Sequence, residues 1–244
     1  MLAGCYPARE PWTYHCPEGT VWDGVSCAPL STGPVVSTVA DPFVGNFRVK
    51  SAAPNGDVAT GHAVIKVESG GVYRATYSVG GLVAEGVGLV HDGVLSVGIG
   101  GPDSGVAQYG VTAPGRLEGT WVFHGSNRQG TEILTGGNAD LSGVYQIEGV
   151  GPDGGTYAGT CDLVVTGDLH TLLWHVPSTS GGVDTYRGLG LRSQGVLSVG
   201  FSTTKTGHLI VTQYRVEGPK RLVGRRASWS TTSPTAATET LVRP

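Results

Sequence analysis

The residues able to do chemistry are few and scattered in this sequence. Its seven histidines are spread over 244 residues, and His170 and His175 would point to opposite faces of a strand, because side chains alternate along it. The chain has no Gly-x-Ser-x-Gly elbow and no His-Glu-x-x-His zinc motif. We therefore expect no catalytic residue, no metal site and no cofactor.

Paired carboxylates are the next candidates, because two acids at a fixed separation can hydrolyse a glycosidic bond. The pairs considered are Glu118 with Glu132, and Asp162 with Asp168. No pattern in the sequence sets either separation, and surface acids greatly outnumber catalytic ones. We therefore assign neither pair a catalytic role.

Four cysteines offer redox or lipid chemistry, and three of them lie within the first 27 residues: Cys5, Cys16 and Cys27. Clustering in a short loop-like segment favours a disulfide, and we predict the bridge Cys16–Cys27. The steps of 11 residues do not match the short spacing of zinc ligands. The pairing of Cys5 and Cys161 stays open.

Aromatic residues fall on predicted strands in both halves of the chain. We expect them to fill a core, although an eight-stranded barrel can also hold one small molecule. The sequence does not select residues for such a pocket. The aromatics are Phe47, Tyr73, Tyr77, Tyr109, Trp121, Tyr145, Tyr157, Trp174, Tyr186 and Tyr214.

The abundance and placement of glycine indicate which secondary-structure elements position these side chains. It accounts for 41 of the 244 residues, against a usual share of about 7%, and falls between short runs of Val, Leu and Tyr. Pairs such as Asn55-Gly56, Asp92-Gly93 and Asp153-Gly154 are favoured in tight hairpin turns. The pattern predicts an all-β protein, and no window shows convincing helical spacing with caps.

The chain also contains an internal repeat. The string Val94–Gly98 recurs identically as Val196–Gly200, and Pro54-Asn55-Gly56 corresponds to Pro152-Asp153-Gly154. The order of the matches is preserved while the offset drifts only from 98 to 107 residues. Further matched pairs are Tyr109 with Tyr214, Leu117 with Leu222, and Thr131-Glu132 with Thr238-Glu239.

The repeat predicts two tandem antiparallel meander domains, each a small eight-stranded barrel, with β-sandwiches as the alternative. We expect a Cys-containing segment and linker at 1–40, a first β repeat at 41–136 and a second at 140–244. The stretch Gly136–Ala139 is expected to join them in a nearly fixed pose. The strands are expected at 43–50, 60–68, 72–79, 83–90, 93–99, 105–112, 116–124 and 130–135, and at 142–149, 157–166, 169–176, 184–191, 195–201, 208–216, 220–229 and 237–242.

These motifs resemble a group of tandem-repeat, glycine-rich β proteins that are secreted by bacteria or known only as hypothetical proteins, some labelled fibronectin-binding. The second repeat carries the pattern best, at Gly143, Tyr145, Pro152–Gly154, Tyr157 and Trp174. The first departs from it at Val58 and Thr76. The resemblance covers about 200 residues and implies a fold, but no functional residue.

The first residues bear on localisation. Leu2-Ala3-Gly4-Cys5 resembles the lipobox of bacterial lipoproteins, which implies lipidation of Cys5 and an extracellular or cell-surface protein held to the membrane only by that anchor. If Met1 is the true start, a component of a virion or another particle is the alternative.

Composition narrows the function further. The formal net charge is −3 with only 14% charged residues, and no basic stripe indicates nucleic-acid binding. We interpret Lys220, Arg221, Arg225 and Arg226 as a solvated hairpin end. We expect a non-enzymatic structural or adhesive protein with protein partners or self-association. The alternatives are a small-ligand-binding barrel and a barrel enzyme of cyclase or isomerase type.

Overall fold

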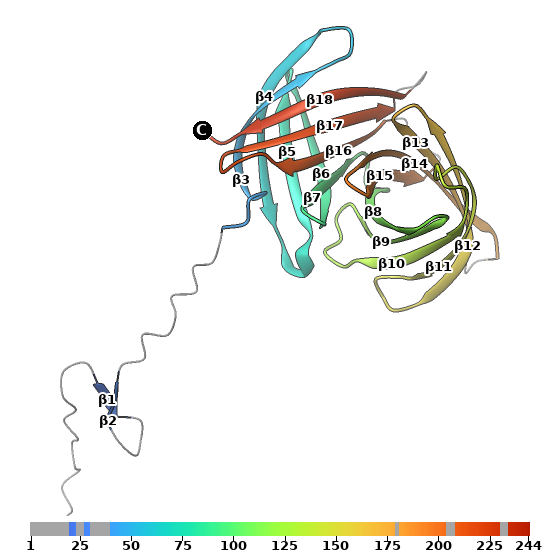
Figure 1. Ribbon diagram of the computed structural model, residues 1–244, viewed down its shortest axis with the longest axis horizontal. Helices are drawn as coiled ribbons and strands as arrows, with labels where there is room; N and C mark the ends of the chain where they lie inside the picture. Colours follow the sequence, from blue (N-terminus) through green and yellow to red (C-terminus); the bar gives the residue numbers. More distant parts are fainter. Residues whose placement is uncertain (1–19, 23–26, 30–39, 179–180, 204–207, 230–233) are drawn as a thin grey trace, which may run out of the picture. The chain divides into compact units, whose positions relative to one another are not determined.

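The computed structural model of the protein describes residues 20–22, 27–29, 40–178, 181–203, 208–229 and 234–244. Within these ranges the chain is all-β apart from one short 3-10 turn, Ser69–Gly71. A small two-stranded sheet pairs β1 (Thr20–Trp22) with β2 (Cys27–Pro29). The remaining sixteen strands form two closed antiparallel barrels of eight strands each (Figure 1). The predicted fold class is thus confirmed.

Barrel one contains eight strands from two separate stretches of the chain, which is why blue and red strands lie side by side in Figure 1. Strand β18 pairs with β3, and β16 pairs with β7, so that the two stretches close one sheet. The strands are β3 (Gly45–Ala52), β4 (Val58–Val67), β5 (Tyr73–Val79), β6 (Leu82–His91), β7 (Val94–Ile99), β16 (Leu209–Val216), β17 (Arg221–Trp229) and β18 (Pro234–Val242).

Barrel two is a continuous up-and-down meander, and it closes where β15 pairs with β8. Its strands follow one another along the chain, so each hairpin supplies one step around the barrel. They are β8 (Ser104–Ala113), β9 (Arg116–Phe123), β10 (Gly130–Gly136), β11 (Gly143–Val150), β12 (Thr156–Thr166), β13 (Leu169–Pro177), β14 (Val183–Ser193) and β15 (Val196–Thr203).

The barrels do not follow the predicted repeats 41–136 and 140–244. Along the sequence, all strands of barrel two lie between β7 and β16 of barrel one. Each barrel therefore takes five strands from one repeat and three from the other. The stretch Gly136–Ala139, expected to join two domains, instead starts at the last residue of β10 and continues into the connection to β11, and these two strands pair within barrel two. The expectation fails because local patterns specify strands and turns, whereas the partner of a strand edge is chosen only in the folded sheet.

Tight turns fix the strand order locally, as the sequence predicts. Asp92 and Gly93 between β6 and β7 both have positive φ, and so do Gln194 and Gly195 between β14 and β15. Two consecutive residues with positive φ form the turn whose twist suits an antiparallel hairpin. All sixteen predicted barrel strands are present, with bounds that shift by three residues or fewer.

The repeated Val-Leu-Ser-Val-Gly strings lie where the barrels meet. Every residue of β7 is buried, because Leu95 and Val97 face the lumen of barrel one while Ser96 faces barrel two. Ser96 and Ser198 share a hydrogen bond of 2.5 Å across the interface. Gln108 donates to Ser96 at 2.7 Å, and Gln213 donates to Ser198 at 2.8 Å. The two repeats are therefore related by pseudo-twofold symmetry at this contact.

Close backbone approach at the same interface explains why the repeated string ends in glycine. A Cβ on Gly98 would lie 2.3 Å from the carbonyl oxygen of Gly105 in β8. Only glycine permits this contact between strands of different barrels. Apolar side chains close the interface on both sides, in one cluster around Val87, Leu89, Val106 and Val122 and another around Leu189, Leu191, Leu209 and Val211.

Candidate ligand-binding cavity

Barrel two contains a cavity of about 340 Å³ in its lumen. Strands β8, β9, β10, β12, β13, β14 and β15 contribute side chains to it, and the β11–β12 turn at Gly151–Gly155 borders it. Seven of the residues that line it carry aromatic rings, several of them only half-buried, so the cavity is open to solvent. The rings belong to Tyr109, Trp121, Phe123, Tyr157, Trp174, Tyr186 and Phe201.

Strand alternation places the rings in one cluster. Trp121 and Phe123 are two residues apart on β9, so both point into the lumen, and their ring centroids are 5.4 Å apart. Phe201 on β15 packs edge-on against Phe123 at 5.2 Å. Tyr157 lies 6.3 Å from Trp121, and Tyr186 lies 6.1 Å from Phe123. We call Trp121, Phe123, Tyr157, Trp174, Tyr186 and Phe201 the aromatic collar.

Two glycines make room for the collar. A Cβ on Gly130 would lie 2.4 Å from the Trp121 ring, directly across the β9–β10 pair. A Cβ on Gly149 would lie 2.1 Å from the Tyr157 ring, across the β11–β12 pair. Each ring therefore lies against bare backbone, and the space it would otherwise need in the lumen remains open.

A carboxyl group, Glu132 on β10, lies at the base of the collar and is only 5% exposed. Tyr109 donates a hydrogen bond to its Oε1, and Tyr157 donates to Oε2 at 3.0 Å. The indole of Trp121 donates in turn to the Tyr157 hydroxyl at 2.7 Å. Burial raises the pKa of Glu132, while the hydrogen bonds from Tyr109, Tyr157 and Trp174 act in the opposite direction.

Barrel one repeats the carboxyl but not the collar. Glu239 occupies the strand position of Glu132 and accepts a hydrogen bond from Tyr214, which corresponds to Tyr109. Five of the six collar positions carry non-aromatic residues, and Tyr77 stands where barrel two has Trp174. The replacements are Arg226 for Trp121, Ser228 for Phe123, Ala59 for Tyr157, Ala84 for Tyr186 and Ile99 for Phe201.

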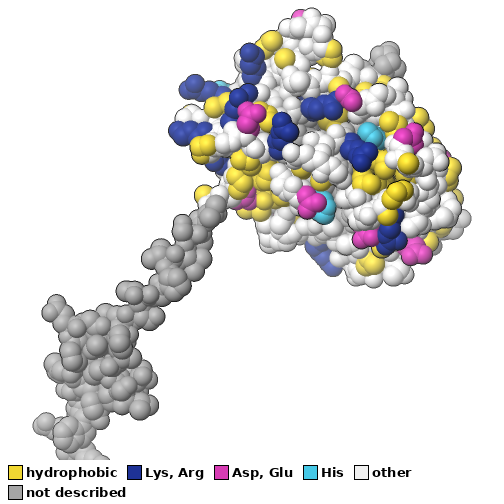
Figure 2. All heavy atoms as spheres, viewed as in Figure 1, with side chains coloured by type: hydrophobic (Ala, Val, Ile, Leu, Met, Phe, Trp, Pro, Cys, Tyr) yellow, Lys and Arg dark blue, Asp and Glu magenta, His cyan; other side chains and the backbone are white. Residues whose placement is uncertain are grey.

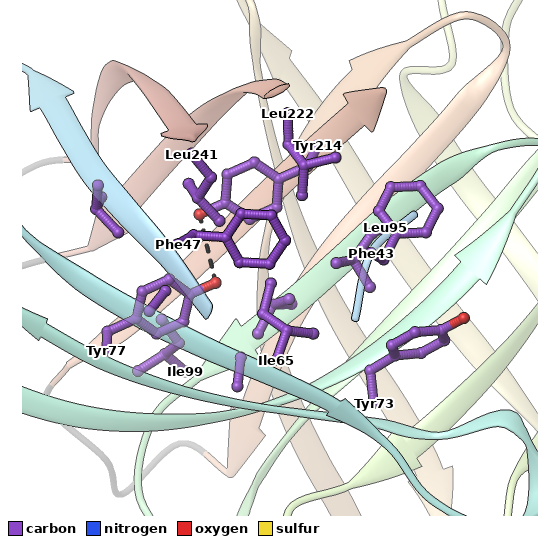
Figure 3. Close-up of a cluster of buried hydrophobic side chains, with 14 residues drawn as sticks. Phe43, Phe47, Ile65, Tyr73, Tyr77, Leu95, Ile99, Tyr214, Leu222 and Leu241 are labelled. Atoms are coloured by element: carbon purple, nitrogen blue, oxygen red, sulfur yellow. Dashed lines mark hydrogen bonds between the residues drawn. The ribbon is translucent and has the colours of Figure 1, made fainter. Parts of the chain in front are cut away.

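The lumen of barrel one is filled by packed side chains. Figure 3 shows Phe47 beside the hydroxyls of Tyr77 and Tyr214, which are 3.3 Å apart. Phe47, Ile65, Leu95 and Leu241 are each 2% exposed or less. Burial raises the pKa of Glu239 too, but here the positive charge of Arg226 acts to lower it.

The carboxylate pairs considered from the sequence are not brought together as sites. Glu118 lies on the outer surface, where it pairs with Arg116 at 2.7 Å, while Glu132 points into the lumen. Asp168 pairs with Arg225 at 2.8 Å, and Asp162 lies 3.8 Å from His175. His170 is buried and His175 is half-buried, on opposite faces as predicted. Within the described ranges, no group of three His, Cys, Asp or Glu residues could hold a metal ion.

The cysteine predictions fall largely outside the described part of the chain. Cys5 and Cys16 lie outside it, and Cys27 is described only as part of β2, so the Cys16–Cys27 bridge and lipidation of Cys5 stay predictions. Cys161 is a free thiol buried in barrel two. Burial raises its pKa well above the usual value.

The basic stretch is only partly the solvated hairpin end that the sequence suggests. Lys220 and Arg221 are exposed at the β16–β17 turn, but Arg226 points into barrel one, where its buried Nε has no hydrogen-bond partner among the described residues. Figure 2 shows Lys and Arg side chains gathered mainly over barrel one on the visible face. No helix in the described ranges is long and apolar enough to cross a membrane.

Five residues of the collar and cavity wall were among the aromatics noted in the sequence, but Phe123, Phe201 and the role of Glu132 were missed. Glu132 did carry a detectable pattern, because Thr131-Glu132 and Thr238-Glu239 match between the repeats. An acid retained on an inward-facing strand position in both copies is a candidate for burial. The structure alone shows that its barrel-two copy faces a cavity.

No family model and no curated protein matches the sequence. Among solved structures, the chain is similar to a protein of unknown function from the DUF3598 family of Nostoc punctiforme. The identity is 12%, and the match covers 82% of this chain and 95% of that chain with a TM-score of 0.18. At this TM-score the similarity identifies neither a fold nor a function.

Proposed function

We propose that barrel two binds a small molecule in its lumen and that the protein functions as a small-ligand-binding protein. The observation that carries the proposal is the open cavity of about 340 Å³ within the aromatic collar. Its volume lies at the lower end of the usual range of ligand pockets, about 300–1,000 Å³. Apolar walls with a few convergent polar groups are typical of such sites, and here Glu132, Tyr109 and Tyr157 are those groups.

The contrast with barrel one supports the same conclusion. A cavity in a barrel lumen costs folding stability, because the lining side chains lose packing partners. Barrel one shows that the same strand framework can be filled. Barrel two instead keeps half-buried rings around a void, and a bound molecule would restore the missing contacts.

Glu132 also favours a second candidate, the enzyme of cyclase or isomerase type, because a buried acid in a cavity can transfer protons. Both of its oxygens, however, accept hydrogen bonds from tyrosines. This geometry is better suited to holding a ligand than to presenting a proton, so binding is the function we favour. The structural or adhesive role expected from the sequence stays a prediction.

The test uses indole, a small neutral aromatic probe, with the full chain in isothermal titration calorimetry. The expected result is saturable binding with one site per chain. Ala107 lines the cavity on β8, so Ala107→Trp should fill the lumen and abolish the binding. Val144, 58% exposed on the outer face of β11, provides the matched control Val144→Trp, which should bind as the parent does.

Native mass spectrometry gives an independent readout of the same proposal. A molecule retained by the purified parent chain and by Val144→Trp, but not by Ala107→Trp, would support a ligand in barrel two. Equal indole binding by the parent and a folded Ala107→Trp variant would contradict it, as would no indole binding and no retained molecule in the parent.

A further inference from the structure

We propose that the ligand of barrel two is a small organic cation, an amine or quaternary ammonium compound, with Glu132 as its counter-ion and the aromatic collar around its charged group. This inference rests on the proposed ligand-binding function and adds the chemical class of the ligand.

The charge of the cavity wall is the first argument. Among the described residues that line it, the ionisable side chains apart from tyrosines are two acids, Glu132 in the lumen and Asp153 in the bordering turn, and none is Lys, Arg or His. Asp153 is exposed, and its Oδ1 accepts a hydrogen bond from the Gly155 backbone at 3.1 Å. A ligand that enters past Asp153 towards Glu132 therefore meets one negative charge at the bordering turn and a second one in the lumen.

The hydrogen bonds around Glu132 are the second argument. Trp121 donates to Tyr157, Tyr157 donates to Glu132, and Tyr109 donates to the other carboxylate oxygen. An ionised carboxylate only accepts hydrogen bonds, so this chain of donors is arranged for the charged form. Among the described residues, no Lys, Arg or His forms an ion pair with Glu132. A buried carboxylate without a cation is costly, and a cationic ligand would supply the missing charge.

Barrel one provides the third argument, because it contains an internal cation at the corresponding position. Arg226 of β17 takes the strand position of Trp121 and is near enough to Glu239 for its charge to act on that carboxyl. In barrel two an aromatic ring replaces this guanidinium, and the lumen is open. The comparison indicates that Arg226 balances the negative charge of Glu239 in barrel one, and that a ligand balances the charge of Glu132 in barrel two.

The collar is the fourth argument. Faces of Trp, Tyr and Phe rings attract cations, and cages of such rings recognise quaternary ammonium groups. Trp121, Tyr157 and Phe201 contribute rings from three different strands, with centroids 6.3 and 6.5 Å from that of Trp121. The carboxylate of Glu132 and the aromatic collar together favour an organic cation with a largely apolar surface, because water solvates such a cation weakly.

The experiment compares two matched probe pairs by calorimetry on the full chain: choline with its neutral isostere 3,3-dimethylbutan-1-ol, and benzylammonium with benzyl alcohol. At least one cation should bind ten-fold or more tightly than its neutral partner. In Glu132→Gln, which keeps the shape of the side chain, that preference should fall to about two-fold, while affinity for the neutral partner stays within two-fold. Glu239→Gln in barrel one is the matched control and should keep the full preference.

Trp121→Arg provides a second variant if Glu132→Gln does not fold, because it introduces the cation of barrel one into barrel two. It should lose the preference for the charged probes. The inference is overturned if neither pair shows a preference, or if a folded Glu132→Gln keeps it. If indole binds but no cation is preferred over its neutral partner, this inference alone is overturned. If neither indole nor any of the four probes binds, and no molecule is retained by the purified chain, the proposed function is overturned as well.

Discussion

The two barrels are built from two copies of the same eight-strand repeat, yet one has a packed lumen and the other an open one. Barrel one fills its centre with Phe47, Tyr77 and Tyr214 (Figure 3). Barrel two has the equivalent carboxyl and tyrosine, but surrounds them with rings that stand against Gly130 and Gly149. Five of the six collar positions are non-aromatic in barrel one, whereas the strand framework is the same in both barrels.

The largest expected effect comes from separating the repeats, because each barrel needs strands from both. Residues 41–139 alone supply five strands of barrel one and three of barrel two, so neither sheet can close. We expect no cooperative unfolding transition for this fragment. Adding residues 140–244 should restore one, measured by circular dichroism against urea, and a single species on native gel filtration.

The outcome that would contradict this is a fragment 41–139 that unfolds cooperatively as a monomer. It would mean that each repeat can close its own barrel, as the sequence alone suggests.

A smaller effect is the difference between the two lumens in how much unfolding free energy is lost when one aromatic ring is removed. Phe47 is 2% exposed in the packed core of barrel one, so Phe47→Ala should lower the free energy of unfolding by about 3–5 kcal/mol. Phe123 is half-buried at the open cavity of barrel two, so Phe123→Ala should cost only about 1 kcal/mol. Urea denaturation of both variants measures the difference, and equal losses would show that the lumens do not differ in packing.

The smallest effect is a pH dependence of the free energy of unfolding, to which Glu132 and Glu239 contribute unequally. Burial raises the pKa of Glu132 and of Glu239, so the folded protein retains protons that the unfolded chain releases. The free energy of unfolding should therefore fall as pH rises from the ordinary Glu pKa of about 4.5 to the raised values. Glu132→Gln should remove more of this slope than Glu239→Gln, because Arg226 offsets the raised pKa only in barrel one.

Glu118→Gln is the control for that measurement. Its ion pair with Arg116 lowers the pKa of Glu118, so its contribution lies below the ordinary Glu pKa and the slope above it should not change. A Glu239→Gln variant that flattens the curve more than Glu132→Gln would contradict the charge balance inferred for barrel one.

Most of the secondary structure could be predicted from the sequence, because its determinants are local. Period-two alternation located the strands, and pairs such as Asp92-Gly93 located the turns, where positive φ is required at neighbouring residues. The aromatic positions followed from the same alternation. The candidate site could not be assembled in this way, because Phe123, Glu132 and Phe201 come from three strands that meet only in the closed barrel.

The positions of the strands and turns, and the correspondence between the two repeats, follow from the local sequence. Which strands share a barrel depends on the folded protein, in which β7 pairs with β16 while β8 pairs with β15. The physical reason is that any strand edge offers the same backbone donors and acceptors. The choice of partner depends on what both faces bury, as in Val94–Gly98, which packs against a lumen on one side and another barrel on the other.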